Sequence, residues 1–303
     1  MKTENAFALK TISAIVIVNV ALLASCSKNN DAVTSTDSDN INSESVSSSY
    51  TDETSDISNN VIIGLSSAQF GSGRVSASAS FAGIKFDARL KGATVTIIPS
   101  SGSTLSNPQG TITIDFGSGQ TVGNVTRSGE IIIAYSGLKW AAGSTRIITY
   151  SNYRRNNVKI EGTLIDTNTS GDSTNTGFSY THAFDGSLVF FNSSSDSIKV
   201  NRTSNFTVSI TFVPYALSYT GSASGTTKGG KNYATTIVTP LTYTAACVLD
   251  GAFIPVSGEK TITVSNGNSS TVYAINYGAG SCDNSVTVSV NGGKEITINA
   301  GGN

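Results

Sequence analysis

A two-residue alternation runs through most of the chain after residue 60 and limits its fold more than any other feature. β-Branched or aromatic residues alternate with Ser, Thr and Asn, and Gly-rich or Asn-rich turns interrupt the runs about every ten residues. Such alternation is typical of antiparallel sheets with one buried face and one wet face. The clearest runs are residues 93–99, 111–116, 130–135, 145–150, 158–165, 206–213, 260–264, 272–277 and 286–290. The sequence therefore predicts an all-β fold of about thirteen or fourteen antiparallel strands, arranged as a sandwich or a large twisted meander, with little helix.

The all-β region spans residues 61–303, which is long enough for one large sheet system or two smaller units. Its segment 114–119 (IDFGSG) recurs as 275–280 (INYGAG), and in both places a second β-run follows after a polar turn. Asp or Asn beside an aromatic residue and then Gly-x-Gly suits a strand that ends in a tight turn. The repeat favours two related β-units with a division near residues 170–215, and chance similarity is the alternative.

The first 25 residues have the pattern of a secretory signal peptide. Lys2 and Lys10 precede an apolar stretch, residues 11–24, that is too short to span a bilayer comfortably. Residues 23–26, at the end of this stretch and just after it, read Leu-Ala-Ser-Cys, which resembles the lipobox of bacterial lipoproteins. The resemblance implies that residues 1–25 are removed and that Cys26 carries the lipid anchor in the membrane. A buried N-terminal helix or a short membrane anchor is the alternative.

The segment from residue 26 to residue 60 is acidic and rich in Ser, Thr and Asn. Seven Asp or Glu residues accompany one base, Lys28, in the stretch 27–60. Such a composition offers little apolar surface, so we expect a disordered linker that lifts the body off the membrane. The remaining chain is mildly basic, but its charges are too few and too scattered to indicate a nucleic-acid partner.

Removing Cys26 from the three cysteines leaves Cys247 and Cys282. In an exported protein this pair is expected to form a disulfide, with two buried free thiols as the alternative. No Cys or His spacing in the chain indicates a zinc site.

Several runs together resemble an uncharacterised family of Bacteroidota surface lipoproteins. They are TITIDFGSGQTVGNVTRSGEIIIAYSG, TRIITYSNYRRNNVKIEGT, LSYTGSASGTTKGGKNYATTIVTPLTY and INYGAGSCDNSVTVSVNGGKEITI, in this order between residues 110 and 298. The resemblance implies an exported all-β protein and no particular activity. It agrees with an outer membrane lipoprotein on the cell surface or on the periplasmic face.

One loop has part of the pattern of a calcium site. Asp166, Asn168, Ser170 and Asp172 place oxygen donors at alternate positions, as at the start of an EF-hand loop. Gly177 occupies the position of the bidentate acid, so a solvated loop is the favoured interpretation and no metal or other cofactor is expected.

Catalytic patterns are few. His182 is the only histidine, and no Gly-x-Ser-x-Gly nucleophile turn occurs. A glycosidase-like pair of carboxylates is compatible with the sequence, because several acids are free to converge in space. The candidates are Asp115, Glu130, Glu161, Asp185 and Asp250.

Trp140, Tyr150 and Tyr153 lie near Arg154 and Arg155, and exposed aromatic residues of this kind can form a platform for sugars or peptides. Ordinary packing between strands is the alternative. We expect a membrane-anchored envelope lipoprotein that is not an enzyme and that binds a glycan or protein partner. The alternatives are a lipid or apolar-ligand carrier with a curved sheet and, after it, a carboxylate-dependent glycan hydrolase.

Overall fold

The computed structural model describes residues 33–64, 75–78, 87–171, 176–249, 253–283 and 285–299. A long helix, α1 (Ser35–Gly64), comes first in this part of the chain, and fifteen strands follow with two short helices among them. The short helices are the 3-10 helix η2 (Ala88–Leu90) and α2 (Ala245–Leu249). The strands are β1 (Val75–Ser78), β2 (Thr94–Pro99), β3 (Gln109–Asp115), β4 (Gln120–Val122), β5 (Val125–Ser136), β6 (Thr145–Arg155), β7 (Val158–Asn168), β8 (Gly177–Phe191), β9 (Ser197–Phe212), β10 (Tyr215–Thr226), β11 (Asn232–Thr244), β12 (Ser257–Asn266), β13 (Ser269–Ala279), β14 (Ser285–Val290) and β15 (Ile296–Asn299).

All fifteen strands of the described residues belong to one antiparallel sheet. Its order is β1-β2-β3-β5-β6-β7-β8-β9-β10-β11-β12-β13-β14-β15, and β4 pairs with β5 beside this path. Neighbours in the chain are therefore neighbours in the sheet, which makes the fold a meander. The prediction of an all-β antiparallel fold is confirmed.

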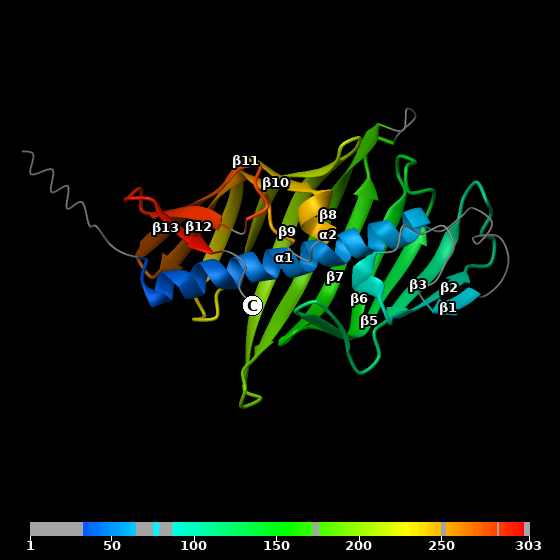
Figure 1. Ribbon diagram of the computed structural model, residues 1–303, viewed down its shortest axis with the longest axis horizontal. Helices are drawn as coiled ribbons and strands as arrows, with labels where there is room; N and C mark the ends of the chain where they lie inside the picture. The colour runs from blue at the N-terminus through cyan, green and yellow to red at the C-terminus, as the bar shows by residue number, and fades with distance from the viewer. Residues whose placement is uncertain are drawn as a thin grey trace, which may run out of the picture.

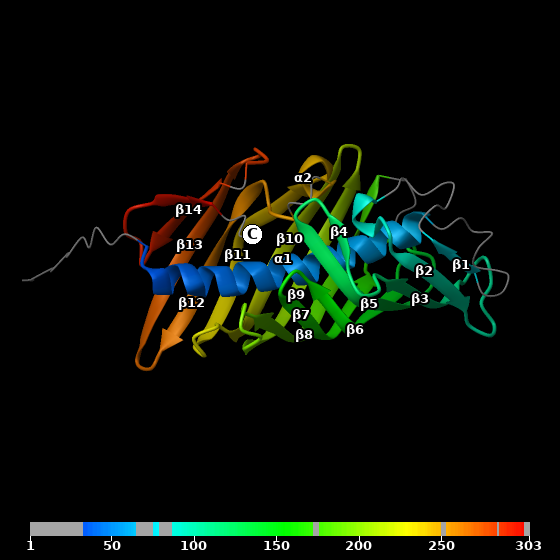
Figure 2. The same ribbon diagram turned by 60° about the horizontal axis from the view of Figure 1, so that its bottom comes forward.

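The sheet curves around α1, which crosses the strands along the inner side (Figures 1 and 2). The alternation in the sequence corresponds to these two sides. In β9, for example, buried and exposed residues alternate without interruption from Val200 to Ile210. We call the side that faces α1 the inner face and the opposite side the outer face.

The prediction of a disordered linker over residues 26–60 is wrong from Ser35 onward, because α1 occupies this segment. Thr34 and Asp37 cap its first turn reciprocally: Asp37 N donates to Thr34 Oγ1 at 3.2 Å and Thr34 N donates to Asp37 Oδ2 at 3.0 Å. Along the helix, Ser and Thr hydroxyls donate to main-chain carbonyls three or four residues earlier, as Ser47 does to Ser43 at 2.6 Å. These bonds allow a polar helix to be buried.

The hydrophobic core falls into two clusters although the sheet is continuous. Phe184 and Leu188 of β8 belong to the cluster toward β2, whereas Phe178 and Tyr180 of the same strand belong to the cluster toward β14. β8 pairs with β9 in unshifted register through this zone. The boundary between the two core clusters thus lies within the predicted division near residues 170–215, whereas the sheet is continuous there.

The two copies of the repeated segment make the same turn. Gly117 N donates to Asp115 Oδ1 at 2.7 Å, and Gly278 N donates to Asn276 Oδ1 at 2.7 Å. Both glycines have positive φ, 58° and 82°, which glycine adopts without strain. The repeat therefore marks two equivalent strand ends.

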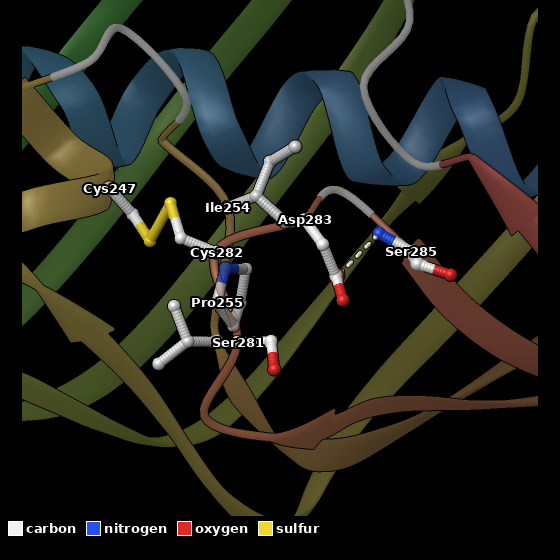
Figure 3. Close-up of a pocket in the computed structure, with 8 residues that line it drawn as sticks. Cys247, Ile254, Pro255, Ser281, Cys282, Asp283 and Ser285 are labelled. Carbon is white, nitrogen blue, oxygen red and sulfur yellow. Dashed lines mark hydrogen bonds between the residues drawn. A yellow bond between two sulfur atoms is a disulfide. The ribbon is translucent and has the colours of Figure 1, made fainter.

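The predicted disulfide between Cys247 and Cys282 is present. It joins α2 to the segment between β13 and β14, and a small cavity lies beside it (Figure 3). In this cavity the Asp283 carboxylate accepts a hydrogen bond from the main-chain N–H of Ser285 at 2.9 Å. Farther along the chain from Cys247, the carbonyl of Phe253 accepts a hydrogen bond from Ser49 Oγ of α1 at 2.8 Å.

Candidate functional site: the ionic interface of α1

Charged side chains gather between α1 and the inner face of the sheet. We call this set the ionic interface. Its members come from α1, from η2 and the residue before it, and from six strands, and all of them are buried. They are Glu44, Asp52, Glu53 and Asp56 of α1, together with Asp87, Arg89, Arg127, Arg146, Arg155, Asp166, His182, Arg202 and Lys260.

Glu53 lies in the second half of α1 and faces three arginines. Its carboxylate accepts a hydrogen bond from Arg127 of β5, and its Oε2 lies 2.7 Å from Arg155 Nε of β6. Arg89 Nη1 lies 4.0 Å from Glu53 Oε1. Burial alone would raise the pKa of the Glu53 carboxyl, but attraction to the three guanidinium groups outweighs it and lowers this pKa. Glu53 is therefore a buried anion.

Arg89 links α1 to the segment before β2. Its Nη2 donates to Asp56 Oδ2 at 2.5 Å and to Asp87 Oδ2 at 2.6 Å. Tyr215 OH of β10 donates to the second oxygen of Asp56 at 3.2 Å. Burial would lower the pKa of Arg89, but the nearby carboxylates, Asp56 foremost, raise it well above its usual value. The guanidinium thus binds two carboxylates from different parts of the chain.

His182 of β8 lies between two carboxylates and is 0% exposed. Its Nδ1 is 2.8 Å from Asp166 Oδ1 of β7, and its Nε2 is 3.2 Å from Asp52 Oδ1 of α1. Burial would lower the imidazole pKa, but attraction to Asp166 and hydrogen bonds to both carboxylates raise it to about 9. The ring is therefore protonated at neutral pH and donates to Asp166 and to Asp52.

Asp166 also joins β6 to α1. Its Oδ2 accepts from Arg146 Nη2 at 3.0 Å and from Ser55 Oγ at 2.7 Å. Desolvation raises the pKa of this carboxyl, but Arg146 and His182 lower it further than desolvation raises it. The hydrogen-bond partners of Asp166 named here are all side chains of this protein, and Asp166 itself is buried.

Glu44 makes the corresponding contacts nearer the start of α1. Its Oε2 accepts from Lys260 Nζ of β12 at 2.5 Å, and its Oε1 is 3.4 Å from Arg202 Nη1 of β9. Burial opposes ionisation of Glu44, but the two cations keep the carboxyl pKa below its usual value. The interface therefore extends over more than two turns of the helix.

Lys139 is a buried amine in a different environment. Its Nζ donates to the carbonyl oxygen of Asn59, in the last part of α1, at 3.2 Å. Burial and then repulsion from Arg146 lower its pKa well below the usual value. A small cavity lined by Lys139, Arg146, Tyr135 and Ile62, among others, lies beside it.

The ionic interface is suited to holding α1 against the sheet. Its carboxylates and its imidazole are bound by partners within the protein and are shielded from solvent. Removing one partner from a buried ion pair destabilises a protein by about 3–5 kcal/mol, because the other charge is left without compensation. The geometry therefore makes the position of α1 specific.

The predicted calcium loop takes a different form. Asp166 is buried in contact with His182, and Asn168 Nδ2 donates to the Lys139 carbonyl at 2.8 Å, whereas Ser170 is exposed. Asp172 lies outside the described residues. The described donors thus point in different directions and do not form a common ion site. Across the described part of the chain, no three His, Cys, Asp or Glu side chains cluster as metal ligands.

The predicted aromatic platform is also not formed. Trp140 is 49% exposed, whereas Tyr153 is 0% exposed and stacks on Tyr150 in the core. Tyr150 OH lies 2.8 Å from Thr54 Oγ1 of α1. The prediction is wrong for the two tyrosines, because the register of β6 shifts around Asn152, whose φ is 49°, and this irregularity brings both rings to the inner face.

Two of the five candidate carboxylates come together. Asp115 and Glu130 are direct partners in the pairing of β3 with β5. Glu161 instead forms ion pairs with Lys159 and Lys199, Asp185 accepts from Thr203, and Asp250 lies outside the described residues. Asp115 Oδ1 is already engaged by the turn amide of Gly117.

No protein family, curated protein or solved structure matches the chain. The helices of the described residues include none that is both long and apolar enough to cross a bilayer. Cys26 lies outside the described residues, so its lipidation stays a prediction.

Proposed function

We propose that the chain is a lipid-anchored envelope protein that is not an enzyme and that binds a neutral glycan or protein partner through the outer face of its sheet. The observation that carries this proposal is the occupation of the inner face by α1. Because the charged groups of that face are bound to the helix, the outer face is the large surface left for contact.

The outer face has an apolar row that crosses six neighbouring strands. The row is defined by direct cross-strand pairing from β2 to β8, and its members are Ile98, Thr111, Ala134, Ile147, Ile165 and Ala183. Ile98, Ile147 and Ile165 are each more than 40% exposed. Ile147 and Ile165 are direct partners across β6 and β7, and adjacent exposed apolar side chains of this kind are typical of a contact site.

A row of threonines runs parallel to the apolar row, two residues along each strand. It crosses five strands by direct pairing and consists of Thr145, Thr167, Thr181, Thr207 and Thr220. Its hydroxyl groups donate and accept hydrogen bonds and carry no charge. Methyl groups beside hydroxyl groups suit a neutral partner such as a glycan.

The alternatives have less support. A carrier of acyl chains needs an apolar hollow, and here α1 fills the inner side with carboxylates and hydroxyls. A hydrolase with two carboxylates needs a groove around the pair, and the cavities beside Cys247 and Lys139 are both lined by other residues. Hydrolysis of a glycan panel that is lost in both Asp115→Asn and Glu130→Gln would favour the hydrolase instead.

Binding of the purified full chain to glycan and protein arrays tests the proposal. We expect retention of a neutral ligand, and Ile147→Glu should reduce that retention by about tenfold, which corresponds to 1.4 kcal/mol. Leu105→Glu is the matched control, because Leu105 is an exposed apolar residue in the turn between β2 and β3. Equal loss in both variants, or turnover of ligands without retention, would contradict the proposal.

A further inference from the structure

We infer that the end of the body where α1 begins is a membrane-facing surface, apposed to the anionic headgroups of the bilayer that holds Cys26. This inference rests on the proposed lipidation of Cys26. Beyond the anchor itself, the inference specifies which part of the protein faces the lipid and which part faces away from it.

The start of α1 is fixed to the body. Asn40 Nδ2 donates to Tyr273 OH of β13 at 3.0 Å, and Tyr273 OH donates to Asp37 Oδ1 at 2.7 Å. The main-chain N–H of Lys228, in the turn between β10 and β11, donates to Ser43 Oγ at 3.1 Å. The chain therefore leaves the body at a defined place, next to β13 and this turn (Figure 1).

The connection from this place to the anchor is short. Val33 is the first described residue, and Cys26 precedes it in the sequence by so few residues that full extension spans at most about 25 Å. α1 contains 30 residues and is therefore about 45 Å long. The tether is thus shorter than the helix, and it holds the starting end of α1 close to the headgroups.

The charge of the adjacent turn fits a lipid surface. Lys228 and Lys231 lie in the turn between β10 and β11. Lys228 Nζ lies 4.3 Å from the centre of the Phe190 ring, and Lys231 is close enough to Asp37 to contribute to lowering its pKa. Ammonium groups near a bilayer are attracted to anionic lipids within about a Debye length. At the other end of α1, the outer-face pair of Asp115 and Glu130 is repelled by such lipids.

One consequence concerns the outer face. With the starting end of α1 toward the bilayer, strands β2 to β7 lie farther from the lipid, as their place along the helix in Figure 1 indicates. Five of the six members of the apolar row lie on these strands, and the row is thereby presented to partners outside the membrane.

Energy transfer to a labelled bilayer tests this orientation. The processed full chain is reconstituted into vesicles of phosphatidylethanolamine and phosphatidylglycerol that contain a headgroup-linked acceptor dye. A donor dye is attached either to Gly229→Cys, in the turn near the start of α1, or to Ser101→Cys, in the turn between β2 and β3. A side chain at Gly229 meets no atom closer than 3.7 Å, so this site tolerates the label.

We expect transfer from Gly229→Cys to exceed transfer from Ser101→Cys by about twofold or more. A flexible Gly/Ser insertion of about twenty residues before Val33 should lower the Gly229→Cys signal, because the mean end-to-end distance grows with the square root of length. Lys228→Ser combined with Lys231→Ser should lower it as well. Equal transfer from the two sites, or a Gly229→Cys signal that the insertion leaves unchanged, would overturn the inference.

The lipid anchor itself is tested separately. Vesicle flotation of the wild type and of Cys26→Ala shows whether attachment depends on the cysteine, and mass spectrometry shows whether Cys26 is acylated. Flotation that survives Cys26→Ala would refute the anchor. Flotation that depends on Cys26 with equal transfer at both labelled sites would refute the orientation alone.

Discussion

The two faces of the sheet consist of the same strands but have opposite chemistry. The outer face carries rows of Thr and Ser with a few isoleucines in contact with water, whereas the inner face carries arginines, tyrosines, a lysine and a histidine that are buried. On most half-buried sheets the inner side is apolar. Here it accommodates charge because α1 supplies the compensating carboxylates.

This difference shows that the buried face is specified by its partner helix. The outer face obtains its hydrogen bonds from water, so single changes there have small effects. The inner face obtains its hydrogen bonds and counter-charges from α1, so a single change there leaves another buried charge without compensation. The predictions below test this difference, from the largest expected effect to the smallest.

Glu53→Gln should have the largest effect on stability. It removes the carboxylate that faces Arg89, Arg127 and Arg155, and we expect the free energy of unfolding to fall by about 3–5 kcal/mol. Urea denaturation of the purified chain measures this change. A decrease in unfolding free energy below about 1 kcal/mol would mean that the three arginines are hydrated in the folded protein and that α1 is loosely held.

The imidazole of His182 should make stability depend on pH. Its folded pKa of about 9 exceeds the ordinary histidine value, so its contribution is complete below about pH 6.5 and is lost as pH rises through 9. We expect the contribution of His182 to the unfolding free energy to fall by about 3 kcal/mol over this interval. Denaturation at a series of pH values measures it.

His182→Gln is the control for this pH dependence. Lys139 has a lowered pKa, so its contribution has the opposite sign and grows as pH rises. The difference between wild type and His182→Gln isolates the imidazole, because Lys139 is common to both. A difference that does not change between pH 6 and pH 9.5 would show that His182 is not charged in the folded protein.

Glu161→Gln should have the smallest effect. Glu161 pairs with Lys159 and Lys199, and both partners are well exposed compared with the inner-face cations. Exposed ion pairs contribute about 0–1 kcal/mol, so we expect the unfolding free energy to change by no more than this. A loss as large as that of Glu53→Gln would remove the distinction between the faces.

Alternation in the sequence was sufficient to predict the strands, because period two follows directly from burying one face. It also predicted the equivalent turns at Asp115 and Asn276. The disulfide followed from counting cysteines. The pairing of charges across the interface was not predictable, because His182 and Asp52 lie far apart in the chain and meet only when the sheet curves around α1.

The sequence contained two signals of α1 that its polar composition obscured. Thr34 and Asp37 have the spacing of a capping box. Val46, Tyr50, Ile57 and Val61 follow spacings of four, seven and four residues, which place them on one helix face, and all four pack in the same core cluster. Composition indicated disorder because it counts the carboxylates as solvated, whereas here they bind buried cations.

Native-state hydrogen exchange of the main-chain amides in α1 tests the central claim most directly. If α1 is held in the curved sheet by the ionic interface, amides of residues 50–62 should exchange as slowly as those of β6 to β8, through global unfolding. Exchange of residues 50–62 at the rate of an unfolded peptide, with the strands still protected, would contradict this account.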